Sequence, residues 1–158
     1  MEVITDSTKE TKELAYKLSQ EIKPGDILAL FGQLGSGKTT FARFLVEALG
    51  ISARVQSPTF VISRKYTNKK CEAHGKEGNG INADTARISS INHLDLYRIT
   101  SMEALLDIGL EDFITEKNAV TLIEWPEVAL QYLPTSATKI YFEYIDENSR
   151  KITIEKHV

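Results

Sequence analysis

The sequence has 158 residues, of which 42% are hydrophobic and 26% are charged. This profile is typical of one soluble globular domain, and the length excludes two domains of ordinary size. The formal net charge of −3 excludes a general basic field that could hold nucleic acid unaided.

The single cysteine, Cys71, excludes an internal disulfide framework and is typical of a reducing compartment. The first ten residues, MEVITDSTKE, have neither a basic start nor an apolar core, so we expect no signal peptide. No apolar run approaches the roughly 18 residues that a membrane-spanning helix needs. We therefore expect a cytoplasmic protein without membrane contact that forms one domain over residues 1–158.

In chain order, the first half predicts a strand, a helix, a buried strand and a second helix, over residues 2–5, 6–22, 26–31 and 38–49. The first helix begins with a capping box, because Ser7 is followed three residues later by Glu10. The second helix ends before Gly50, where a glycine is commonly found just beyond a helix.

The second half predicts three strands over residues 59–66, 91–99 and 119–125, a helix over residues 101–114 and a pair of strands within residues 138–157. Residues 67–90 lack periodicity, and we expect a long loop or hairpin insertion there. Strands that alternate with helices indicate an α/β fold with a mostly parallel sheet and antiparallel edge strands.

The stretch GQLGSGKT, residues 32–39, satisfies the P-loop pattern in full and lies between a predicted buried strand and a predicted helix. Its glycines allow backbone N–H groups to surround a phosphate at a helix N-terminus. Lys38 can reach the β- and γ-phosphates, and the Thr39 hydroxyl can bind Mg²⁺. The motif therefore indicates a nucleotide site in a three-layer fold of the P-loop NTPase type.

Mg²⁺ in such a site needs a second anchor, which is normally a carboxylate at the end of a neighbouring strand. Glu124 and Asp95 both fit this position in the sequence. Two alternatives stay open here: Glu124 as a solvated strand end, and Asp95 as a surface partner of Arg98.

The sequence favours ATP over GTP. A guanine-reading stretch would place a carboxylate after Asn68-Lys69-Lys70, where Cys71 stands, and Arg98 stands where a GTPase switch has glycine. A small-molecule kinase and a nucleotide sensor that does not hydrolyse remain alternatives to an ATPase.

Five stretches in compatible order, LFGQLGSGKTTFAR, VQSPTFVI, HLDLYR, GLEDF and LIEWPE, closely resemble the bacterial TsaE (YjeE) ATPases. The resemblance implies a Mg²⁺-dependent ATPase that acts with TsaD and TsaB proteins in making threonylcarbamoyladenosine beside the tRNA anticodon. It implies tRNA as an indirect partner, through that complex. The stretch over residues 67–90 is longer than the family usually shows.

The resemblance also implies roles for individual residues. Lys38, Asp95 and Glu124 would be catalytic, with Thr39 and Glu124 holding Mg²⁺ and Asp95 positioning the metal shell or the attacking water. Trp125 would belong to the site or a partner face, with a largely buried core aromatic as the alternative. Nucleotide contacts would come from Thr8, Gly35, Ser36, Gly37, Lys38, Thr39, Thr40 and Arg150.

No motif arginine is placed as an obvious finger within the chain, and such a residue is worth about 10³–10⁵ in rate when a partner supplies it. We therefore expect weak hydrolysis by the chain alone and faster hydrolysis in the complex.

Overall fold

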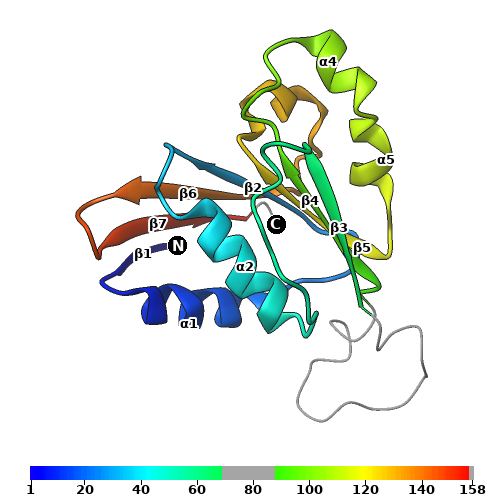
Figure 1. Cartoon of the computed structure of the whole chain (residues 1–158). Coiled ribbons are helices and arrows are strands. Elements are labelled where there is room, and N and C mark those ends of the chain that lie inside the picture. Colours follow the sequence, from blue (N-terminus) through cyan, green and yellow to red (C-terminus); the bar gives the residue numbers. More distant parts are fainter. Residues whose placement is uncertain (69–87, 157–158) are drawn as a thin grey trace, which may run out of the picture.

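The computed structural model describes residues 1–68 and 88–156 (Figure 1). Its seven strands form one sheet in the order β1-β7-β6-β2-β5-β4-β3. The pairs that join β6, β2, β5 and β4 are parallel, and the outer pairs are antiparallel. The strands are β1 (Glu2–Thr5), β2 (Ile27–Gly32), β3 (Ser63–Thr67), β4 (Ser90–Asp95), β5 (Ala119–Glu124), β6 (Thr138–Tyr144) and β7 (Arg150–Glu155).

Helices cover both faces of this sheet. Those on one face, α1 (Thr8–Ser19) and α2 (Lys38–Ala48), lie side by side (Figure 1). On the other face lie α4 (Met102–Asp107), α5 (Leu110–Thr115) and the 3₁₀ helix η2 (Pro126–Tyr132).

Two apolar clusters fill the spaces between these layers. Because side chains alternate along a strand, neighbouring residues of one strand enter different clusters. Leu28 and Leu122 pack with α1 and α2, whereas Ile27 and Ile123 pack with the residues around α4, α5 and η2. The predicted three-layer α/β fold, parallel in its centre and antiparallel at its edges, is confirmed.

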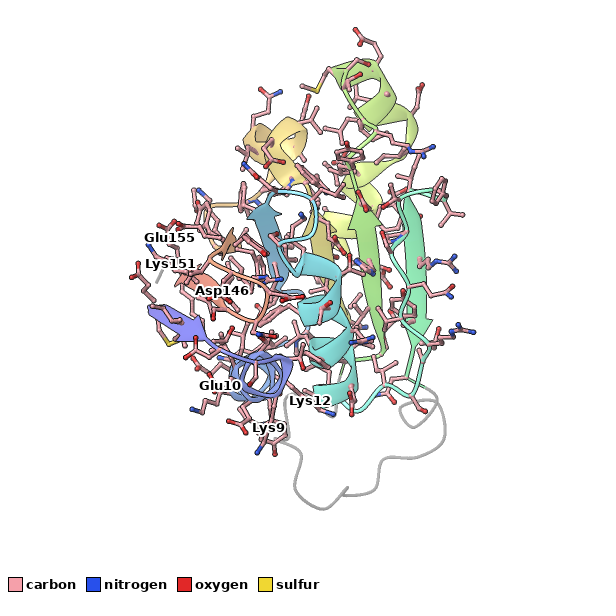
Figure 2. The ribbon with its side chains drawn as sticks, turned by 60° about the vertical axis from the view of Figure 1, so that its left-hand side comes forward. Lys9, Glu10, Lys12, Asp146, Lys151 and Glu155 are labelled. Atoms are coloured by element: carbon pink, nitrogen blue, oxygen red, sulfur yellow. The ribbon has the colours of Figure 1, made fainter. Side chains whose placement is uncertain are left out.

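The hairpin of β6 and β7 buries one face only. Ile152 and Ile154 enter the cluster under α1 and α2. The opposite face is polar, and Lys151 lies 3.2 Å from a Glu2 carboxylate oxygen and 3.4 Å from one of Glu143. Figure 2 shows Lys151 on this hairpin, away from the labelled side chains of α1. This face follows the alternation of an antiparallel sheet with one solvated side.

Most predicted elements occur, but several boundaries are different. The predicted helix over residues 101–114 is two helices, because Gly109 between them has a left-handed φ of 68°. The predicted strand over residues 59–66 begins only at Ser63, because a turn precedes it in which the Ile62 N–H donates to the Pro58 carbonyl. The 3₁₀ helix η2 was not predicted.

The remaining boundary errors lie at the ends of elements. The first helix ends at Ser19, and the predicted strand over residues 91–99 stops at Asp95. The Ser7 hydroxyl accepts from the Glu10 N–H at 3.2 Å, as the capping box predicts. The Glu10 carboxylate, however, accepts from the Asp6 N–H at 2.9 Å and not from that of Ser7.

The expected insertion over residues 67–90 lies mostly outside the described residues, as does Cys71. Its two ends are part of the sheet, since Thr67 of β3 pairs with Ser90 of β4. Within residues 1–68 and 88–156, no helix has the length and apolar character needed to cross a bilayer.

Candidate functional site

The site forms where β2, β5 and β4 end. These strands are parallel neighbours, so their carboxyl ends meet at one edge of the sheet. The register pairs Leu30 with Glu124 and Glu124 with Asp95. The chain leaves β2 at Gly32 and enters α2 at Lys38, which places the glycine-rich loop over this edge.

The loop residues leave an open cradle. Gly35 and Gly37 have left-handed φ values of 77° and 106°, and a Cβ atom on either would meet nothing within 4 Å. Gly37 is also the N-cap of α2, so the first N–H groups of this helix face the same space. Such a cradle fits the phosphates of a nucleotide, because backbone N–H groups and the helix dipole both favour an anion.

Lys38 is only 4% exposed, yet it begins a helix at the mouth of the pocket. Its ammonium donates to the carbonyl of Gly32 at 2.7 Å and to that of Gln33 at 3.0 Å. The Nζ atom also lies 4.1 Å from the centre of the Trp125 ring. Burial lowers the pKa of Lys38, and the nearby carboxylates of Glu124, Asp95 and Glu127 act in the opposite direction.

Thr39 and Glu124 contact each other across the pocket, and the Thr39 hydroxyl donates to Glu124 Oε2 at 2.9 Å. Glu124 is 2% exposed, so the alternative of a solvated strand end is wrong. Its other oxygen, Oε1, lies 2.8 Å from Nε2 of the buried His93. Both oxygens of this carboxylate are therefore held.

Asp95 is 3% exposed and forms no ion pair with Arg98 among the described residues, so the surface-pair alternative is wrong. Its Oδ1 accepts from the Tyr97 N–H at 2.9 Å. Its Oδ2 accepts from the hydroxyls of Ser57, at 3.2 Å, and Thr59. A carboxylate with this many donors keeps one orientation.

These side chains line one pocket of about 230 Å³. The predicted residues Gly35, Gly37, Lys38, Thr39 and Thr40 lie on it, together with Asp95 and Glu124. Larger hollows lie elsewhere, including one of about 620 Å³ between β1 and α1, but they lack this set of polar groups.

Three predicted nucleotide contacts lie outside the lining of this pocket. The Ser36 side chain is buried, close to Gly32 and Phe142. Thr8 is exposed at the start of α1, and the Arg150 guanidinium donates to the carbonyls of Asp146 and Ser149. Arg150 lies on β7, at the same edge of the sheet as the glycine-rich loop.

Trp125 and Tyr97 form an aromatic wall of the pocket, with ring centres 4.8 Å apart. Trp125 is half-buried and has a left-handed φ of 56°. A bulky residue in this conformation is unusual and occurs mostly where function requires it. Trp125 lines the pocket and belongs to neither apolar cluster of the described residues.

The side-chain oxygen atoms of the pocket can be compared with the ligands that Mg²⁺ prefers. Among the described residues, no group of three or more His, Cys, Asp or Glu side chains could hold a metal ion. Thr39 and Glu124 instead offer one hydroxyl and one carboxylate. This small set fits Mg²⁺, which commonly binds through one or two protein oxygens, phosphate oxygens and water.

Three further residues, Ser57, Thr59 and His93, each touch a predicted site carboxylate and were not among the predicted site residues. One signal for His93 was available: residues two apart on a strand share a face, so His93 points to the same side as Asp95. Ser57 and Thr59 lie in the stretch VQSPTFVI, but their contact with Asp95 depends on a turn in irregular chain.

The sheet order and the glycine-rich turn between β2 and α2 define an α/β protein of the P-loop NTPase-like class. A crystal structure of YdiB from Bacillus subtilis has this fold. It matches 99% of this chain and 84% of its own length, with a TM-score of 0.72 and 28% sequence identity.

Sequence comparison defines the family. The family "Threonylcarbamoyl adenosine biosynthesis protein TsaE" matches residues 5–152. Proteins named tRNA threonylcarbamoyladenosine biosynthesis protein TsaE from Bacillus subtilis and Aquifex aeolicus are each 32% identical, over 94% and 97% of this chain and 81% and 94% of their own lengths. The chain belongs to the TsaE family, whose proteins take part in tRNA threonylcarbamoyladenosine biosynthesis.

Proposed function

We propose that this protein is a cytoplasmic, Mg²⁺-dependent ATPase that supports threonylcarbamoylation of the tRNA adenosine next to the anticodon. It binds and hydrolyses ATP in complex with TsaD- and TsaB-type proteins, and tRNA is an indirect partner through that complex. One observation carries the proposal: Lys38, Thr39 and two buried carboxylates line the same pocket at the end of the parallel strands.

In this proposal Lys38 binds the terminal phosphates. Its ammonium then exchanges the carbonyls of Gly32 and Gln33 for phosphate oxygens, which carry more negative charge. Thr39 and Glu124 hold Mg²⁺, which when bound neutralises charge on the β- and γ-phosphate oxygens. The direct contact between Thr39 and Glu124 supports this assignment, because it keeps both oxygens at one point of the pocket.

Asp95 orients the attacking water or the water around the metal. Ser57, Thr59 and the Tyr97 N–H fix its carboxylate before any nucleotide arrives, so little reorganisation is needed during the reaction. Tyr97 and Trp125 limit access of bulk water from their side of the pocket.

Hydrolysis by the chain alone is slow in this proposal. No arginine of the described residues lines the pocket, so this part of the chain offers no evident counterpart to an arginine finger. A partner that supplies such a group raises the rate by about 10³–10⁵ in related phosphoryl-transfer enzymes.

The test is phosphate release with ATP or GTP, measured with and without the TsaD- and TsaB-type proteins. We expect Mg²⁺-dependent release that prefers ATP and rises in the assembled complex. Transfer of phosphate to an added metabolite would instead identify a small-molecule kinase. Nucleotide binding without release under every partner condition would identify a sensor, and full speed by the lone chain would refute partner activation.

A further inference from the structure

His93 is a buried polar residue beside the site to which the proposed reaction assigns no role. It lies on β4 and is 0% exposed. Its Nε2 lies 2.8 Å from Glu124 Oε1, while the Thr39 hydroxyl occupies Oε2. The Glu124 carboxylate is thus clamped between a histidine behind it and a threonine at the pocket.

The other side of the imidazole leads away from the pocket. His93 Nδ1 lies 3.5 Å from the hydroxyl of Tyr66 on β3, and that hydroxyl donates to the Gln56 carbonyl at 3.3 Å. Burial raises the pKa of Tyr66, which favours the protonated hydroxyl. Gln56 directly precedes Ser57, whose hydroxyl contacts Asp95.

These contacts form one connected path through the site. It runs from Glu124 through His93 and Tyr66 to Gln56. Gln56 begins the segment 56–59, which contacts Asp95 through Ser57 and Thr59. The segment 56–59 therefore touches one site carboxylate directly and the other through two buried rings.

The composition of this face of the sheet indicates that the path is more than packing. On this face, Ile91 of β4 and Val120 and Leu122 of β5 are apolar and enter the main cluster. Polar residues begin at His93, next to Glu124. A buried polar pair is costly and adds little stability compared with apolar residues of the same volume.

We propose that His93 is a positioning residue for Glu124, and that Tyr66 ties it to segment 56–59 so that the two site carboxylates are held in fixed relation. A ligand carboxylate that receives a second hydrogen bond keeps one orientation toward a metal, and loss of that bond commonly lowers metal affinity. This inference rests on the proposed role of Glu124 as a metal ligand.

Three variants separate the contacts of the path. His93→Leu removes both ring nitrogens. His93→Gln keeps an N–H donor able to reach Glu124 but loses the link to Tyr66, and Tyr66→Phe removes only the hydroxyl. Tyr141→Phe is the matched control, because Tyr141 lies on β6 and stacks on Phe31, away from the pocket lining.

The measurement is Mn²⁺ affinity by electron paramagnetic resonance, with the full chain and a saturating non-hydrolysable ATP analogue. Nucleotide affinity in EDTA and Tm are measured beside it. Glu124→Ala is the reference for complete loss of this carboxylate. It should weaken Mn²⁺ binding more than nucleotide binding in EDTA, because the P-loop backbone contacts remain.

We expect His93→Leu to weaken Mn²⁺ binding about 10–100-fold, with nucleotide affinity in EDTA unchanged. His93→Gln should recover part of this loss, Tyr66→Phe should cause a smaller loss, and Tyr141→Phe none. A folded His93→Leu protein with wild-type Mn²⁺ affinity would overturn the proposal, as would equal losses with and without metal.

If His93→Leu does not fold, the other two variants decide, and wild-type Mn²⁺ affinity in both would overturn the proposal. Failure of the proposed ATPase function is a separate result, in which the wild-type complex binds Mn²⁺ and nucleotide but releases no phosphate. Absence of nucleotide-dependent Mn²⁺ binding in the wild-type protein would refute both proposals.

Discussion

Polar residues are buried in one region of the sheet and exposed in another. The centre, meaning β2, β5 and β4 with the loops at their carboxyl ends, is covered by helices on both faces. The margin, meaning β1, β7 and β6 with α1, is covered on one face only. Charged side chains of the margin, such as Lys151 and Glu143, lie at the surface, whereas Glu124 and Asp95 in the centre are buried.

This difference identifies the region in which the energetic cost of burying polar groups has to be explained. A surface ion pair contributes little to the free energy of unfolding. A buried carboxylate is costly unless donors surround it, and Glu124 and Asp95 each have such donors. We therefore expect changes in the centre to alter activity strongly, and changes in the margin to alter only stability, by small amounts.

The largest effect is expected for Lys38→Ala. Removal of the ammonium should lower ATP hydrolysis by the assembled complex about 10³-fold or more, because no other described cation lines the pocket. The helix should persist, since alanine favours helix. Phosphate release and Tm are the measurements, with Lys17→Ala on the exposed side of α1 as control. Normal release from folded Lys38→Ala would mean that the centre is not a phosphate site.

The next effect concerns Gly32, where centre and margin join. A Cβ atom there would lie 2.5 Å from the Phe142 carbonyl oxygen on β6, and φ is 143°. We expect Gly32→Ala to lower the free energy of unfolding by about 2–4 kcal/mol in urea titrations. Gly35→Ala has open space around it and should lose about 1–2 kcal/mol, from the left-handed backbone alone. Equal losses would show that the contact with β6 is unimportant.

A third prediction concerns Asp95→Asn, which keeps the shape but removes the charge. We expect ATP affinity near normal and hydrolysis lower by about 10²-fold, as is typical for one preorganised electrostatic group. Titration of nucleotide binding and phosphate release by the assembled complex are measured together. Asp107→Asn, on the exposed side of α4, is the matched control. Normal release would remove Asp95 from the catalytic residues and leave Thr39 and Glu124 to hold the metal alone.

The sequence predicted the parts of this centre that depend on local patterns. The P-loop lies within eight consecutive residues, Glu124 follows a mostly apolar run, and Asp95 lies in a stretch of alternating character. The contacts of Asp95 with Ser57 and Thr59 could not be predicted, because they depend on the turn that ends at Ile62. The contact of His93 with Glu124 depends on β4 and β5 being neighbours, which no local pattern specifies.

The margin was predicted for a different reason. Its last two strands, within residues 138–157, were predicted because both segments alternate between apolar and polar residues and the turn residues Asp-Glu-Asn-Ser divide them. The single predicted helix over residues 101–114 failed because Gly109 lies within an apolar helical pattern that hides the break. Local periodicity therefore describes the margin better than the packing around the site.

The smallest effect is expected on the margin helix. Lys12 of α1 and Glu47 of α2 form a 2.7 Å ion pair in which the side chains are 50% and 59% exposed. Figure 2 labels Lys12 beside Lys9 on the same helix, and Lys9 has no ion pair among the described residues. Lys12→Ala should lower the free energy of unfolding by about 0.2–1 kcal/mol more than Lys9→Ala.

Because both Lys12 and Glu47 are largely in water, that difference should shrink as salt is raised, and hydrolysis should not change. Urea titrations at low and high salt, with phosphate release measured on the same preparations, provide the check. A loss from Lys12→Ala that is large, independent of salt, or accompanied by slower hydrolysis would mean that α1 is coupled to the pocket. The separation between a functional centre and a margin that only stabilises would then be wrong.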